Sequence, residues 1–92
     1  MIVRISTEGQ YELGEDATAA LNELDNQVVA ACDGDDEQAF KTRFGRMLEL
    51  VRTEGHPVPE DELTGSDVIL PPPDVSLEEA KAEFTGEGLI PG

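Results

Sequence analysis

Cysteine and histidine often supply nucleophiles, general bases and transition-metal ligands, and each occurs only once in the 92-residue sequence. A lone Cys32 cannot form an intrachain disulfide, and no neighbouring cation or base indicates a lowered thiol pKa. His56 precedes a proline in a loop-like stretch and has no potential co-ligand nearby in the sequence. We therefore interpret Cys32 as a small apolar residue near a helix end and His56 as a surface residue.

Carboxylates are the only abundant reactive groups, with 21 Asp and Glu residues. Acid–base hydrolysis needs two carboxyls at a defined separation inside a cleft, and among so many acids any chosen pair is weak evidence. The sequence contains neither a Gly-rich phosphate loop nor a nucleophile elbow. We predict a protein that is not an enzyme, with no catalytic, cofactor-binding or metal-binding residues. An enzyme that uses carboxylates and a divalent ion is the remote alternative.

The segment Asp33-Gly34-Asp35-Asp36-Glu37 raises the question of a calcium loop. An EF-hand loop has glycine at its sixth position and a bidentate glutamate at its twelfth. Counted from Asp33, these positions hold Gln38 and Phe44, so the match fails. The segment instead predicts a tight turn between helices, with Gly34 in a left-handed conformation and a capping box from Asp35 to Gln38.

The formal net charge is −15, with only six Lys and Arg residues. Such a charge argues against binding to nucleic acid through phosphates and against direct adhesion to anionic lipid. Two explanations stay open: a surface that attracts a basic partner, or adaptation to a salt-rich cytoplasm, as in halophiles.

The charge is unevenly distributed along the chain. Residues 35–54 contain four basic and five acidic residues, a net of −1, and the remainder contains two basic and sixteen acidic residues, a net of −14. The nearly neutral segment either pairs internally with acidic neighbours, which we favour, or forms a face for self-association.

Secondary-structure patterns divide the chain into three parts. Residues 2–6 and 10–13 are two extended runs around a glycine-containing turn, which predicts a hairpin. A helix is expected from an N-cap at Asp16 to Gly34, because its apolar residues recur at steps of three and four. This stripe consists of Ala17, Ala20, Leu21, Leu24, Val28 and Ala31, and Asp25 is expected mostly away from it.

A second helix is expected over residues 36–53, antiparallel to the first across the short turn. Gly45 lies inside it and is interpreted as a position of close helix–helix contact. Its apolar face consists of Phe40, Phe44, Met47, Leu48 and Val51, which would form the main core with the first helix.

The last third contains an apolar run over residues 67–70, three prolines and a capping box from Ser76 to Glu79. Because proline cannot extend a ladder, the run predicts an edge strand beside the hairpin. The capping box opens a short helix with Leu77, Ala80 and Phe84 on one side.

Binding features remain once chemistry is set aside. The prolines are expected to form a stiff polyproline segment, and the aliphatic tail either folds back on the core, which we favour, or inserts into a partner. The candidate partner-binding residues are Leu70, Pro71, Pro72, Pro73, Asp74, Leu89 and Ile90.

Three sequence blocks, MIVRI…EGQYEL, PVPEDEL..SD..LPPPD and SLEEAK…EGLIPG, together resemble the phage-shock-protein-A-associated family, PspAA. The resemblance covers essentially the whole chain, and none of the blocks is a catalytic signature. It implies an accessory role beside a PspA-like protein, a coiled-coil membrane-remodelling protein related to the ESCRT-III superfamily, in envelope stress response or membrane maintenance.

The sequence thus predicts one domain over residues 1–92 with an α+β fold. A small antiparallel sheet, made of the N-terminal hairpin and a strand near 67–70, packs on an αα-hairpin, and a short C-terminal helix follows. No apolar run is long enough for transmembrane insertion and no signal peptide is recognised. We expect a cytoplasmic interaction module, peripheral to the membrane through its PspA-like partner. The alternative is a small structural protein that self-associates as a homo-oligomer.

Overall fold

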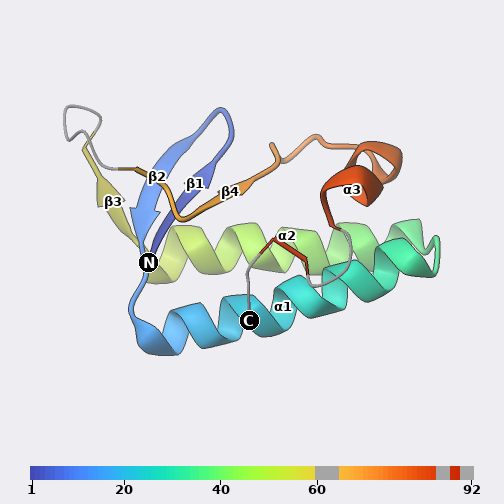
Figure 1. Ribbon diagram of the computed structural model, residues 1–92, viewed down its shortest axis with the longest axis horizontal. Helices are drawn as coiled ribbons and strands as arrows, with labels where there is room; N and C mark the ends of the chain where they lie inside the picture. Colours follow the sequence, from blue (N-terminus) through green and yellow to red (C-terminus); the bar gives the residue numbers. More distant parts are fainter. Residues whose placement is uncertain (60–64, 85–87, 90–92) are drawn as a thin grey trace.

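The computed structural model describes residues 1–59, 65–84 and 88–89, and it has the expected α+β fold. A four-stranded sheet packs on a pair of long helices, and a short third helix lies beyond one sheet edge (Figure 1). The elements, in chain order, are β1 (Ile2–Ile5), β2 (Gly9–Glu12), α1 (Glu15–Asp33), α2 (Glu37–Glu54), β3 (His56–Val58), β4 (Val68–Leu70) and α3 (Leu77–Glu83).

The sheet has the strand order β3-β2-β1-β4. The N-terminal hairpin pairs as expected, with Val3 opposite Tyr11, and β3 adds to it as a further antiparallel strand. β4 lies at the other edge, with Val3 opposite Val68, but it runs parallel to β1. The prediction of an antiparallel sheet was therefore wrong in this detail, and the sheet is mixed.

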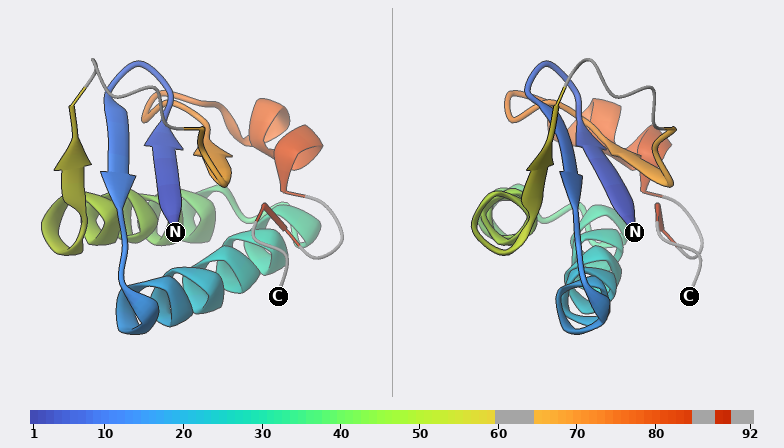
Figure 2. Two further views of the ribbon diagram at one scale, coloured as in Figure 1. Left: turned by 60° about the vertical axis from the view of Figure 1, so that its left-hand side comes forward. Right: turned by 90° about the vertical axis from the view of Figure 1, so that its left-hand side faces the viewer.

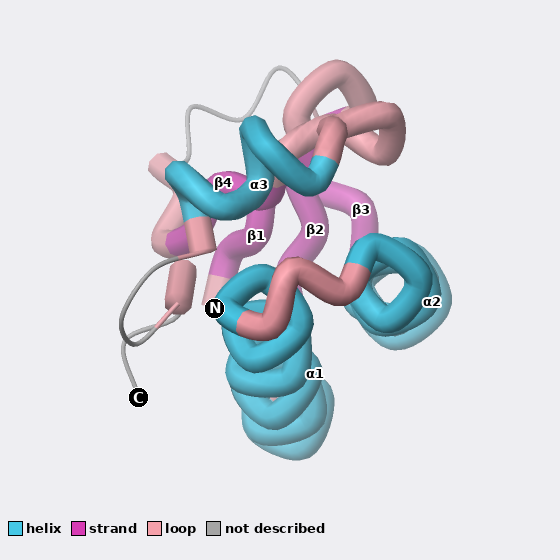
Figure 3. The backbone as a smooth tube through the Cα atoms, turned by 90° about the vertical axis from the view of Figure 1, so that its right-hand side faces the viewer, coloured by secondary structure: helices cyan, strands magenta, loops and turns pink. Residues whose placement is uncertain are grey.

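The helix pair forms one layer under the sheet, and the strands stand above it (Figure 2). Seen end-on, α1 and α2 lie side by side, and α3 lies above α1 (Figure 3). All five residues predicted for the apolar face of α2 are buried. Of the stripe predicted for α1, Leu21, Val28 and Ala31 are buried, Ala17 and Leu24 are half-buried, and Ala20 is exposed, so the prediction was wrong for Ala20. The alternation of the strands turns Val3, Ile5, Val68 and Leu70 toward this layer.

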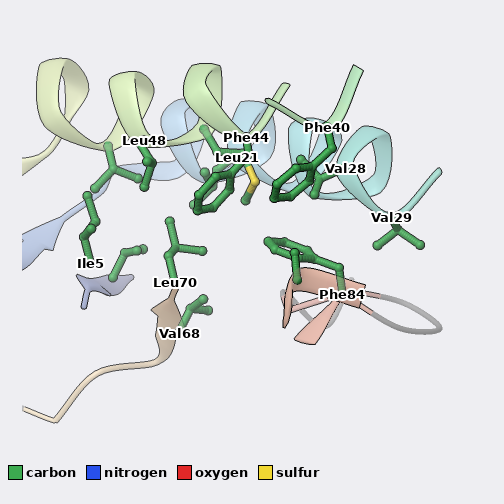
Figure 4. Packing of buried hydrophobic residues seen from close by; sticks show 14 of the residues in the cluster. Ile5, Leu21, Val28, Val29, Phe40, Phe44, Leu48, Val68, Leu70 and Phe84 are labelled. Carbon is green, nitrogen blue, oxygen red and sulfur yellow. The ribbon is translucent and has the colours of Figure 1, made fainter. Parts of the chain in front are cut away.

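Aromatic rings join α3 to the helix pair (Figure 4). Phe40 and Phe44 stack with ring centroids 5.4 Å apart, and Phe84 meets Phe44 edge-on at 5.9 Å. Because Phe84 is the C-cap residue of α3, this contact ties the end of the short helix to the core.

The helix ends differ from the predicted ones. α1 begins after Gly14, not at Asp16, and Asp35 rather than Gly34 takes the positive φ, at 55°. Asp36, one residue later than expected, caps α2 by accepting from the Ala39 N–H at 3.1 Å. In a segment dense in Gly and Asp several residues can cap equally well, so the pattern locates the turn but not its register.

Gly45 does not mark a helix contact, which corrects the prediction from sequence. It is exposed, and a Cβ atom added there would meet nothing within 4 Å.

The basic residues of 35–54 are only partly paired. Arg52 donates its Nε to Glu8 Oε1 at 2.9 Å, and Lys41 pairs with Glu37 of its own helix at 3.1 Å. Arg43 and Arg46 have no acidic partner in the part of the chain that the structure describes. The favoured hypothesis of internal pairing holds for Arg52.

Candidate partner-binding groove

A groove lies between β4, the proline segment and α3. These elements form the orange to red part of the chain in Figure 1. Its volume is about 190 Å³. Sites for small molecules typically enclose about 300–1,000 Å³, so this groove suits a single side chain better than a ligand of that kind. We call it the Ile69 groove, and its lining residues are Ser6, Ile69, Pro71, Pro72, Val75, Glu79 and Glu83.

Ile69 is the apolar centre of the groove. The alternation of β4 buries Val68 and Leu70 and turns Ile69 to the opposite face, where 57% of its surface is exposed. Among the large hydrophobic residues in the described ranges, Ile69 alone has most of its surface exposed to solvent. Strand periodicity in the sequence could have identified Ile69, because a three-residue apolar run at an edge must present its middle residue outward.

The predicted partner-binding residues in the proline segment lie at different depths. Leu70 is fully buried and Pro71 is buried at the groove wall, whereas Pro72 is half-buried. Pro73 and Asp74 are exposed. Leu70 therefore belongs to the core, and the role of the others in partner binding stays a prediction.

The prolines do not continue as an extended polyproline rod. The Val75 N–H donates to the Pro72 carbonyl at 3.1 Å, which closes a turn through Pro73 and Asp74. The turn brings the chain back toward α3, so that Pro72 and Val75 lie on the same groove. The expectation of a polyproline segment was thus wrong beyond its second residue.

The acidic wall of the groove comes from α3. Ser76 forms the predicted capping box, in which its Oγ accepts from the Glu79 N–H at 3.1 Å. In return, Glu79 Oε1 accepts from the Ser76 N–H at 3.5 Å and from the Ser76 hydroxyl at 3.0 Å. Glu83 follows one turn later, so both carboxylates lie on the groove side of the helix. Lys81 instead pairs with Asp35. In the described part of the chain neither glutamate has a basic partner.

The sheet side of the groove is different in charge. Arg4 is the register partner of Ile69, so the two side chains share the outer face of the sheet. Arg4 is exposed and forms no ion pair with the described residues. Two carboxylates therefore line the groove on the α3 side, whereas Arg4 lies beside Ile69 on the outer face of the sheet without lining the groove.

The C-terminal segment is held by a buried carboxylate that sequence reasoning missed. Asp25 of α1 has no exposed surface, although an acid at this position was expected mostly away from the apolar stripe. Its Oδ1 accepts from the Leu89 N–H at 3.1 Å, and Leu89 packs against the core. The favoured fold-back of the tail is therefore seen for Leu89, while Ile90 lies outside the described residues.

Cys32 and His56 have the environments expected from the sequence. Cys32 is buried, and its pKa is raised, mainly by burial and further by the charge of Asp33. A raised pKa keeps the thiol protonated and unreactive. His56 lies exposed in an edge strand.

A second, larger hollow of about 540 Å³ lies at the start of α1. Its lining includes Leu13, Thr18 and Ala19, and Glu15 is its only acidic residue. Thr18 and Asn22 add polar groups to this lining, but none of the predicted partner-binding residues that the structure describes lies there. The Ile69 groove contains Pro71 and Pro72 from that prediction, so it is the better candidate for partner binding. Within the described ranges no helix combines the length and apolar character needed to cross a membrane.

In a comparison with protein families, the chain matches the family model for the PspA-associated protein, PspAA, over residues 1–92. Comparisons with curated proteins and with solved structures found no match.

Proposed function

Because this chain belongs to the PspA-associated protein family, we propose that it is a non-catalytic accessory module that binds a PspA-like protein. The observation that carries the proposal is the extent of the family match, which covers the entire sequence and not a fragment of it. The family description links the chain to PspA, and the partner, its membrane role and the absence of catalysis are our inference.

Stoichiometric binding is the proposed mechanism. PspA-like proteins resemble ESCRT-III proteins, which remodel membranes through assembly, so a bound module can shift the balance between soluble and membrane-bound forms. We propose that this shift serves the response to envelope stress. The chain would then be recruited to the membrane surface only through its partner.

The charge of the chain supports an indirect route to the membrane. At −15 it is repelled by anionic lipid headgroups and attracted to basic protein surfaces. Exposed charges farther apart than about 10 Å are screened at 0.1 M salt, so the attraction should weaken as salt rises.

Co-elution tests the proposal. The purified chain and the PspA-like protein from the same genome are mixed and analysed by size-exclusion chromatography with light scattering. We expect a stoichiometric complex at low and moderate salt. In a second assay with anionic vesicles, addition of the chain should change the amount of PspA-like protein that is bound to the membrane. Absence of a complex at every salt concentration would refute the proposal.

Self-association is the second candidate function, and the exposed Ile69 on an edge strand favours it. Light scattering of the chain alone distinguishes the two. A stable dimer or larger species without a partner supports self-association, whereas a monomer that becomes larger only with the PspA-like protein supports the accessory role.

A further inference from the structure

We propose that the Ile69 groove binds one large aliphatic side chain from a basic amphipathic helix of the partner. This inference rests on the proposed accessory function and assigns it a surface. It commits to a helical segment whose apolar face carries a residue such as Leu or Ile and whose flank carries Lys or Arg.

The apolar part of the groove determines the first requirement. Ile69 is exposed by 57%, and the half-buried Val75 and Pro72 lie beside it in a space of about 190 Å³. An inserted aliphatic side chain would remove apolar surface on both partners from water. Pro71 and Pro72 have fixed φ angles, so this wall is already ordered before binding.

The form of the sheet edges favours a helix over an added strand. β4 has only three residues and is followed directly by Pro71, which has no N–H to donate to another strand. The opposite edge, β3, is equally short and contains Pro57. Short edges interrupted by proline are a common protection against strand addition, so the partner is expected to bind through side chains.

The charges around the groove determine the second requirement. Glu79 and Glu83 lie four residues apart on α3, a spacing that matches two cations on successive turns of a facing helix. Lys81 points to Asp35 and does not neutralise them. Because Arg4 lies on the sheet side, the basic residues of the partner helix should face α3 and not β1.

Three variants test the groove. Ile69→Ser removes the apolar centre, and Glu83→Lys reverses one carboxylate at the end of α3, where a cation is compatible with the helix dipole. Glu78→Lys is the matched control. Glu78 is exposed on the same helix and does not line the groove, and its replacement by lysine causes the same change in net charge. Thermal melting of each variant verifies that it is folded, and Glu83→Gln replaces the lysine variant if that one does not fold.

Affinity for the PspA-like protein is measured by titration calorimetry at two salt concentrations. We expect Ile69→Ser to weaken binding about 10-fold or more, as expected for a buried aliphatic contact. Glu83→Lys should weaken it about 5-fold or more with a smaller salt dependence, and Glu78→Lys should stay within about 2-fold of the original chain.

The outcomes separate the groove from the proposed function. If a complex forms and the groove variants bind as tightly as the original chain, the Ile69 groove is not the binding surface, while the proposed accessory function still holds. If Ile69→Ser instead abolishes a dimer of the chain alone, the groove is a self-association surface and the inference is overturned.

If no complex forms with the PspA-like protein, the proposed function fails and the groove is tested with a synthetic helical peptide of Leu and Lys. Chemical shifts that change at Ile69, Val75 and Glu83, and are lost in Ile69→Ser, support the groove. Shifts that are absent, or that appear only elsewhere on the acidic surface, overturn it.

Discussion

Replacing Gly88 by alanine should destabilise the protein strongly, because this glycine packs against the buried carboxylate of Asp25. Gly88 has a φ of +87°, and a Cβ atom added there would lie 2.7 Å from Cγ and 2.8 Å from Oδ1 of Asp25. Both distances are well below a normal van der Waals contact. Since Asp25 is fully buried and protein interiors are close-packed, moving its side chain also disturbs its neighbours.

The magnitude follows from two costs and one gain. A left-handed conformation costs a non-glycine residue about 1–2 kcal/mol. Displacing Asp25 breaks its hydrogen bond to the Leu89 N–H and leaves a buried polar group unsatisfied, which costs about 1–3 kcal/mol. Alanine also restricts the unfolded chain more than glycine does, and this stabilises the folded state by about 0.4–1 kcal/mol. We expect a net loss of about 2–4 kcal/mol in the free energy of unfolding.

Urea denaturation and thermal melting measure this loss, and Gly45→Ala is the matched control. Gly45 lies exposed within α2 with open space around its Cα, so the same substitution should stabilise the protein there by up to about 1 kcal/mol. For a domain of this size a change of 1 kcal/mol shifts the melting temperature by about 4–8 °C. The two alanine variants should therefore differ by more than about 10 °C, in opposite directions from the original protein.

Hydrogen exchange of the Leu89 amide decides whether the mechanism is correct. In the original chain this N–H is bound to Asp25 and should be protected, and in Gly88→Ala it should exchange much faster. A Gly88→Ala variant within about 0.5 kcal/mol of the original protein, with an equally protected Leu89 amide, would show that the tail is not held by Asp25.

Three further predictions follow from the ion pair, the thiol and the short helix. The hydrogen bond from Arg52 lowers the pKa of Glu8 below its ordinary 4.5, so its contribution to stability is present above that pH and is lost as the pH falls below it. Glu8→Gln should therefore cost about 0.2–1 kcal/mol at pH 7 and nothing in acid or in 1 M salt, and equal costs at pH 7 and pH 3 in denaturation curves would contradict this. Burial raises the pKa of the Cys32 thiol, so the native protein should react slowly with a thiol reagent. At pH 8, absorbance should show labelling at least about 100-fold slower for the native protein than for the denatured chain. Comparable rates would show that Cys32 is accessible to the reagent. Ser76→Ala removes the cap of α3 and should cost about 1 kcal/mol in thermal melts, whereas no loss would show that Phe84 alone holds this helix in place.

The two long helices were predictable because their burial repeats with the period of a helix. Phe40, Phe44, Met47, Leu48 and Val51 all face the core as their spacing indicates. Local capping at the start of α3 was equally predictable, because the two residues that form the capping box, Ser76 and Glu79, are only three positions apart in the sequence.

Strand direction was not predictable from these local patterns. The hairpin determines the pairing of β1 with β2, but β4 is distant in sequence and could pair with the free edge of β1 in either direction. β3 was also missed as a strand, since Pro57 lowers the strand tendency of a three-residue segment.

The candidate site was predicted only in part. The prolines drew attention to the correct segment, but the exposed Ile69 and the carboxylate of Glu83 come from two elements that only the folded chain brings together. Asp25 could not have been found at all, because an acidic residue within a helix is expected at the surface unless a partner for it is known. That partner is a backbone N–H at the other end of the sequence.

The late position of β4 in the sequence determines when a chain growing on the ribosome can complete its sheet. β1 emerges before the other three strands and lies inside the sheet, yet one of its two neighbours is β4, which begins only at Val68. The hairpin and the two long helices need only nearby residues and can form while synthesis continues. A nascent chain that stops short of Val68 would keep these parts and present the open edge of β1 as a template for another copy.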